Sequence, residues 1–171
     1  MRDISLHILD IAQNSLAANA SLVEISVEET SDYIEVTIKD NGKGMSEEEL
    51  KKVTDPFYTT RKTRKVGLGL SLFKQNVELT NGSFSIESKP NVGTVVNAKF
   101  NRHSIDCLPL GDLLETFITL IILNPDTDFV FKHKSPVKDY QLDTRELKTV
   151  LNEIKINEIP VINWIREDYN G

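Results

Sequence analysis

The sequence is poor in the features on which several classes of protein depend. A single cysteine, Cys107, among 171 residues excludes a disulfide scaffold and a zinc site built on several thiolates. With 20 Lys and Arg against 26 Asp and Glu, the net charge is −6, which disfavours broad adhesion to nucleic acid or to an anionic membrane. The most apolar run, residues 113–123, contains Glu115 and is too short to span a bilayer. We therefore expect a cytoplasmic protein that binds neither nucleic acid nor membrane.

What is present fits a folded chain, since 39% of the residues are hydrophobic and 27% charged. The length allows one domain of about 100 residues with a smaller companion. The composition changes after residue 100, which predicts an N-terminal domain over 1–100 and a C-terminal extension over 101–171. Periodicity and capping residues predict helices over 3–18, 67–80, 109–123, 144–152 and 158–168, and a short helix that begins at Ser46. Alternating apolar residues and turn residues predict strands over 21–29, 33–39, 83–88 and 94–100, and a hairpin over 128–142.

The first predicted helix has a polar stripe on a mostly apolar surface. Asp3, His7, Asp10 and Asn14 are spaced i, i+4, i+7 and i+11, which places them on one face. Isoleucine and leucine fill most of the remaining circumference, so we expect the helix to be largely buried. A polar side chain buried without a partner costs about 1–3 kcal/mol, and a carboxylate costs more. Two interpretations stay open: the stripe faces solvent, or Asp10 and Asn14 face a bound metal with its waters.

A loop follows the second predicted strand, with Asp40 at its start and glycines at positions 42 and 44. Glycine permits φ > 0 and a close approach of the backbone to a flat ligand. The Asp40 carboxylate can accept a hydrogen bond from an exocyclic amine such as that of adenine. An ordinary Asn-Gly turn with an incidental aspartate is the alternative.

A second glycine-rich segment, Gly67-Leu68-Gly69-Leu70-Ser71, begins the helix over 67–80 and follows a basic loop. Backbone N–H groups at a helix N-terminus bind anions, and neighbouring cations strengthen such a site. The spacing fits neither a Walker loop nor a Rossmann fingerprint. The alternative is a solvated basic loop before an ordinary helix.

Taken in order, these segments resemble the GHKL superfamily, whose Bergerat-fold ATP-binding domain is shared by histidine kinases, type II topoisomerases, the heat-shock chaperone ATPase and MutL. The resemblance covers residues 1–100, and its motifs match His7 to Ala20, Asp40 to Met45, Asp55 to Arg61, Gly67 to Ser71, Gly82 to Ile86 and Gly93 to Val95. It implies the α+β class: a Bergerat α/β sandwich in which a mixed, mainly antiparallel sheet has helices on one face. The residues after 100 would add a small α+β extension.

The resemblance also implies roles for individual residues. Asn14 would coordinate Mg²⁺, Asp10 would stand where ATP-hydrolysing members have a glutamate base, and Asp40 would bind the adenine amine. Residues 57–66 would form a lid over the nucleotide. The full set that the resemblance assigns to ATP is Asn14, Asp40, Gly42, Gly44, Met45, Phe57, Thr60, Arg61, Lys62, Lys65, Gly67, Leu68, Gly69, Leu70 and Thr94.

Some positions depart from the family pattern. Asp10 is one methylene shorter than glutamate, so it would hold the attacking water from further away or only orient a metal-bound water. Ala18 and Ser21 stand where many sensor kinases have a second asparagine and a basic residue. Lys65 and Val66 replace the Gly-Thr pair often found before the last glycines.

Three functions are compatible with these residues. The first is a Mg²⁺-dependent ATP-binding protein that acts as a slow ATPase or ATP-gated switch in signalling, with a protein partner and with a homodimer left open. The second is a kinase unit that phosphorylates His or Ser on a separate protein, since we expect no phosphoacceptor hairpin in this chain. The third is a non-enzymatic ATP sensor.

Two further expectations concern residues outside the motifs. His7 is expected to be structural or to support the neighbouring nucleotide residues rather than to accept phosphate, whereas His103 and His133 are expected at the surface. The apolar helix over 110–123 and Trp164 are expected to be buried, because exposed apolar patches are costly. Burial within the chain is expected, and burial against a second copy of the chain is the alternative.

Overall fold

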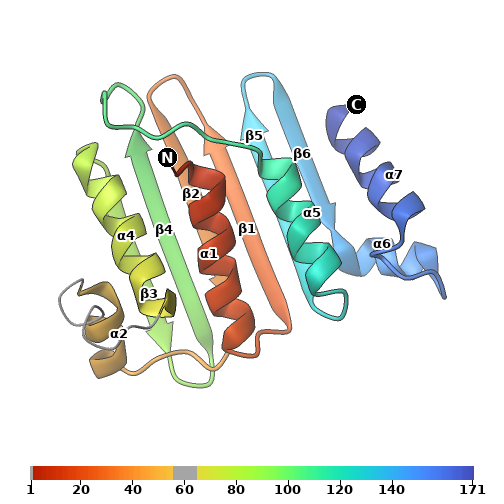
Figure 1. Cartoon of the computed structure of the whole chain (residues 1–171), viewed down its shortest axis with the longest axis horizontal. Coiled ribbons are helices and arrows are strands. Elements are labelled where there is room, and N and C mark those ends of the chain that lie inside the picture. Colours follow the sequence, from red (N-terminus) through yellow and green to blue (C-terminus); the bar gives the residue numbers. More distant parts are fainter. Residues whose placement is uncertain (1, 56–64) are drawn as a thin grey trace.

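The computed structural model describes residues 2–55 and 65–171, with the backbone alone at 65–68. It consists of one six-stranded sheet with helices α1, α4 and α5 lying across one face (Figure 1). The elements are α1 (Ile4–Ala17), β1 (Leu22–Glu29), β2 (Tyr33–Asp40), α2 (Glu47–Thr54), α4 (Lys65–Leu79), β3 (Ser83–Lys89), β4 (Gly93–Asn101), α5 (Leu113–Leu123), β5 (Asp128–Ser135), β6 (Lys138–Asp143), α6 (Thr144–Leu151) and α7 (Ile159–Asn170). None of the helices in the described ranges is long and apolar enough to cross a membrane.

The strand order is β3-β4-β2-β1-β5-β6. Neighbouring strands pair antiparallel except β1 and β5, which run parallel. The predicted α+β class with a mixed, mainly antiparallel sheet and helices on one face is therefore confirmed. Strands β5 and β6, which follow residue 100, continue the sheet directly from β1. The predicted division into 1–100 and 101–171 thus runs through a shared sheet, and it stays a prediction.

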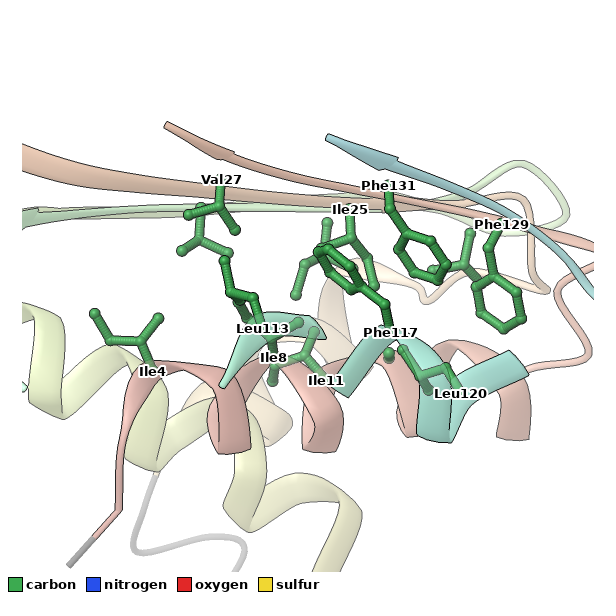
Figure 2. Close-up of a cluster of buried hydrophobic side chains, with 14 of the residues drawn as sticks. Ile4, Ile8, Ile11, Ile25, Val27, Leu113, Phe117, Leu120, Phe129 and Phe131 are labelled. Carbon is green, nitrogen blue, oxygen red and sulfur yellow. The ribbon is translucent and has the colours of Figure 1, made fainter. Parts of the chain in front are cut away.

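The core lies between the sheet and the helices. Alternate residues of the central strands, such as Ile25 and Val27 of β1, point toward helix α1, whose Ile4, Ile8 and Ile11 point back at them (Figure 2). Helix α5 adds a second row of apolar side chains facing β5, and Phe117 stacks on Phe131 with ring centroids 4.2 Å apart. The expectation that the apolar helix is buried within the chain is confirmed.

Trp164 of α7 was expected to be buried with that helix, and this expectation is wrong. Its side chain is 48% exposed, while Val161, Ile162 and Ile165 of the same helix are buried. Helix α7 therefore packs on the rest of the protein through a narrow stripe of apolar side chains, and Trp164 lies at the edge of that stripe.

His133 also departs from its expected place at the surface. It is 6% exposed, and its ring lies between Tyr169 Oη, 2.7 Å from Nδ1, and Glu29 Oε2, 2.5 Å from Nε2. These contacts join the end of α7 to β5 and β1. His103 is exposed as expected, with Asp32 Oδ1 2.9 Å from its Nε2.

Helix ends follow the capping chemistry of the sequence. Asp3 caps α1 by accepting a hydrogen bond from Leu6 N at 2.9 Å. Ser46 and Glu49 form a complete capping box at the start of α2. These caps fix where α1 begins and where the chain leaves the loop that follows β2, and that loop borders the candidate site.

Candidate nucleotide site

The Asp40 carboxylate at the end of β2 is held from two directions. Ser15 Oγ of α1 donates a hydrogen bond to Oδ2 at 2.6 Å, and Gly42 N donates to Oδ1 at 2.8 Å. These bonds fix the orientation of a half-buried carboxylate between helix and sheet. Each oxygen of a carboxylate has two acceptor positions, so the group retains capacity for a ligand's donor.

A polar row crosses the helix-facing side of the sheet at this end. Asp40 of β2 pairs in register with Thr94 of β4, and Thr94 pairs with Ser88 of β3. The hydroxyls of Ser88 and Thr94 are 2.8 Å apart, and Met45 N donates to Ser88 Oγ at 2.8 Å. One row further into the sheet, the equivalent positions are apolar: Ile38, Val96 and Ile86. Ile38 and Val96 are buried in the core, so the polar row of Asp40, Thr94 and Ser88 lies where the core ends.

Two glycines near this row are required by the protein itself. Gly44 has φ +68°, and a Cβ at this position would lie 1.9 Å from Lys89 O. Gly93 has φ +137°, and a Cβ there would lie 2.0 Å from Asp40 O. The loop after β2 therefore packs directly on the β3–β4 turn. This contact explains the glycine at 44 without a ligand, so its contact with a purine stays a prediction.

The polar stripe of α1 has three different environments. Asp3 is the helix cap, and His7 is fully buried, stacked on Phe73 with ring centroids 5.2 Å apart. Burial, together with the nearby Arg2 charge, lowers the pKa of His7 to about 4. Asp10 and Asn14 lie further along the helix and are half-buried, and Asp10 forms an ion pair with Arg2. The expected structural role of His7 is thus confirmed. Of the four stripe residues, Asp10 and Asn14 are the two that could face a ligand.

Gly69 of α4 faces these two side chains. A Cβ at Gly69 would lie 3.6 Å from Asp10 Cβ and 4.0 Å from Asn14 Nδ2, both ordinary contact distances. The fold therefore has no steric need for glycine at 69, in contrast to Gly44 and Gly93. Gly69 is itself buried, and its lack of a side chain lets the backbone of α4 lie close to a carboxylate and an amide of α1.

The other residues of the glycine-rich motif differ in what the structure describes. Lys65, Gly67 and Leu68 lie in the first turn of α4, with the backbone alone described. Leu70 is 4% exposed and belongs to the core, so a contact with nucleotide would have to come from its backbone. The predicted lid residues Phe57, Thr60, Arg61 and Lys62 lie outside the described residues.

Three residues beside this site were not among the predicted site residues. Ser15 immediately follows Asn14 but lies about 100° around the helix from it, and it contacts Asp40 only because β2 ends beside α1. Ser88 is the last inward position of β3 after Phe84 and Ile86, and this alternation could have indicated it. No sequence pattern indicated that Arg2 lies beside the site, because its pairing with Asp10 depends on how its side chain lies along α1.

The donor set suits a magnesium ion held mainly by a nucleotide. Within the described ranges, no three His, Cys, Asp or Glu side chains are grouped so that they could hold a metal by themselves. Mg²⁺ in nucleotide sites usually takes one or two protein oxygens, with phosphates and waters completing the shell. The Asn14 amide, with Asp10 one turn away, fits that pattern.

Comparisons with known proteins address the fold and the family, and the first concerns the fold. The chain is similar to the Aquifex aeolicus MutL ATPase domain complexed with ADP, with a TM-score of 0.54 at 16% identity over 98% of this chain and 88% of that one. It is also similar to the N-terminal domain of a DNA repair protein, with a TM-score of 0.58 at 16% identity over 100% of this chain and 57% of that one. These similarities establish a shared fold.

The family follows from the sequence. Residues 2–104 match the family described as histidine kinase-, DNA gyrase B- and HSP90-like ATPase, and the chain belongs to it. The resemblance to the GHKL superfamily is thereby confirmed. The sensor histidine kinase YvrG of Bacillus subtilis is 37% identical over 95 residues, which are 52% of this chain and 16% of YvrG. The match thus spans about a sixth of that relative.

Proposed function

We propose that this chain binds ATP with Mg²⁺ in the site between α1, α4 and the loop after β2, and that it is a slow ATPase or ATP-gated switch. The observation that supports this most strongly is Gly69. It faces Asp10 and Asn14, and a Cβ added at this position would meet them at ordinary contact distance, so the fold does not need a glycine there. Family membership supplies the nucleotide class, since the MutL relative is described with ADP.

Asp40 is proposed to recognise the adenine ring. Its carboxylate is fixed by Ser15 and Gly42, and its free acceptor positions would accept the exocyclic amine of adenine. Guanine has a carbonyl at the equivalent position, which would meet the carboxylate with acceptor against acceptor. Thr94, joined to Ser88 in the neighbouring strand, would contact the same edge of the ring.

The phosphates are proposed to lie between Asp10 and Asn14 of α1 and the start of α4. Free backbone N–H groups in the first turn of α4, where Gly67 lies, would bind them, with Gly69 allowing their close approach and Arg61, Lys62 and Lys65 assisting. When bound, magnesium would neutralise phosphate charge, with Asn14 as its ligand from this chain. Asp10 would orient the attacking water and accept its proton.

Phosphotransfer to a separate protein is the second candidate. It is favoured by the similarity to YvrG, which is a sensor histidine kinase. The acceptor would be a His or Ser of a partner protein, and the chain would act in the cytoplasm in signal transduction. In this case ATP binding would require the same residues, and turnover would require the partner.

One experiment separates these proposals: nucleotide affinity and ADP release are measured with Mg²⁺ for the unchanged chain, Asp10→Asn and Asp40→Asn. We expect ATP to bind and GTP to bind much more weakly. Asp40→Asn keeps an acceptor oxygen for Gly42 N, and its contact with Ser15 is kept if Ser15 Oγ accepts from the new amide. It should nevertheless lose ATP binding because a donor replaces an acceptor. Asp10→Asn should lower turnover about a hundredfold or more at unchanged affinity.

The outcomes differ for each proposal. ATP binding without turnover would favour the kinase unit or a passive switch, and adding candidate acceptors would then distinguish these two. Equal affinity for ATP and GTP would contradict the adenine assignment of Asp40. Absence of nucleotide binding would contradict the proposed function as a whole.

A further inference from the structure

The guanidinium of Arg2 forms an ion pair with the Asp10 carboxylate. Arg2 precedes the cap of α1, and Asp10 is in its second turn, so the Arg2 side chain lies back along the helix toward the candidate site. The pair thereby places a cation on the proposed base. Arg2 is also close enough to His7 for its charge to contribute to the lowered pKa of that ring.

The backbone that presents Arg2 is firmly held. Asp3 accepts hydrogen bonds from Leu6 N at 2.9 Å and Ser5 Oγ at 2.6 Å. Ile4 N and Ser5 N donate to Pro109 O and Leu110 O, each at 2.9 Å, which fastens the start of α1 to the segment before α5. The Arg2 side chain is therefore the movable part, and it extends from a fixed point beside the site.

The ion pair itself contributes little to the fold. The Arg2 and Asp10 side chains are 42% and 38% exposed, and exposed pairs of this kind contribute about 0–1 kcal/mol. A phosphate group offers arginine more charge and a bidentate geometry. The exchange of Asp10 for a phosphate would thus be favourable, and it would not disturb the core.

The position of the pair indicates which phosphate this would be. Asp10 lies beside Gly69 and one turn before Asn14, the proposed magnesium ligand, so Arg2 approaches from the side of Asp10 away from Asn14. Resting on the proposed function, we propose that Arg2 binds the terminal phosphate of ATP and leaves Asp10 when it does so. In the absence of that phosphate, Arg2 neutralises Asp10.

This exchange would make the state of the Asp10 carboxylate depend on whether ADP or ATP is bound. With ADP, Arg2 stays on Asp10, and the carboxylate is not free to accept a proton from water. With ATP, the terminal phosphate takes the guanidinium and releases the carboxylate at the place where water must attack. Arg2 would thus favour ATP over ADP and couple binding of ATP to the availability of the base.

The test uses calorimetry with Mg²⁺ on the full chain, titrating ADP and the non-hydrolysable imido analogue of ATP. Arg2→Gln should weaken the analogue about tenfold to a hundredfold, the effect of losing a hydrogen bond to a charged group. It should change ADP affinity less than about twofold. Arg166→Gln is the matched control, because Arg166 forms a similarly exposed ion pair with Glu115, and it should change neither affinity.

A second pair of variants separates phosphate binding from an effect through Asp10. Asp10→Asn should bind the analogue at least as tightly, since the competing carboxylate is gone, and Arg2→Gln should still weaken the analogue in that background. Equal losses for the analogue and ADP, no loss for either, or an Arg2 effect that vanishes with Asp10→Asn would each overturn the inference. If the unchanged chain bound neither nucleotide, the proposed function would fail first.

Discussion

At the scale of single residues, His7 shows how a helix can use one polar stripe for unrelated purposes. It shares a face with Asp10 and Asn14, yet its ring is fully buried against Phe73, and Asn76 Nδ2 is 3.0 Å from its Nε2. Its Nδ1 has no hydrogen-bond partner among the described residues. The imidazole is thus kept neutral, which makes His7 a source of pH-dependent stability.

The stability of the protein should therefore fall as the pH is lowered from 6.5 to about 4. The unfolded chain binds a proton at His7 near pH 6.5, whereas the folded protein binds it only near pH 4, so acid favours the unfolded state. The contribution is fully present above pH 6.5 and reaches a loss of about 3 kcal/mol near pH 4. Urea unfolding at several pH values measures this loss.

The variant His7→Phe isolates this effect from the titration of carboxylates. Its stability should depend less on pH than that of the unchanged chain between pH 6.5 and 4. His103→Asn removes an exposed histidine and should leave the original pH dependence in place. Identical pH profiles for the unchanged chain and His7→Phe would contradict the assignment.

At the scale of elements, the site depends on how closely α4 approaches α1. Gly69 lies at the fifth position of α4, inside a regular helix, where glycine is less favourable than alanine by about 0.5–1 kcal/mol. Asp10 and Asn14 are at van der Waals distance from the place of its missing Cβ. Glycine at position 69 therefore makes the folded protein less stable than alanine would, at the point where the nucleotide is proposed to bind.

Gly69→Ala should separate the needs of folding from those of binding. We expect the free energy of unfolding to rise by about 0.5–1 kcal/mol, because the new methyl group fits and alanine favours the helix. ATP affinity should fall about tenfold, because the methyl group stands between α4 and the polar side chains of α1. Urea unfolding and calorimetry measure the two effects.

Gln75→Ala is the control for helix propensity, since Gln75 is exposed on the same helix. It should raise stability slightly without altering affinity. A Gly69→Ala variant that binds ATP as tightly as the unchanged chain would remove the main support for the proposed site.

At the scale of the whole molecule, the segment that matches the family is shorter than the sheet. The match ends at residue 104, but β5 pairs with β1 in register over seven residue pairs, and α5 covers part of the core. Without these elements β1 would become an exposed edge, and Ile8 and Ile25 would lose apolar neighbours (Figure 2). We therefore infer that the matched segment depends on the rest of the chain.

The full chain should unfold as one unit. Trp164 is the sole tryptophan and lies in α7, so its fluorescence reports on the C-terminal elements, whereas far-UV circular dichroism reports on the whole chain. In urea the two signals should change at the same midpoint. A fragment of residues 2–104 should show no cooperative transition. Separate midpoints, or a cooperatively folding fragment, would instead indicate two independent domains.

The sequence by itself determined the elements and the family. Helices and strands were predictable because caps, glycines and apolar periods act between residues that are near each other in the chain, as at Asp3 and in the Ser46–Glu49 capping box. The order of the motifs likewise predicted the fold class and placed Asp40 and Thr94 near one another. Both depend on the covalent order of residues, which the sequence states directly.

Only the tertiary structure decided which side chains meet. The bonds of Asp40 to Ser15 and of His133 to Glu29 and Tyr169 join residues 25 to 104 positions apart. The exposure of Trp164 and the pairing of Arg2 with Asp10 were not evident from local patterns either. Such contacts depend on strand register and on the angle at which helices pack on the sheet, and both result from the summed packing of the whole core.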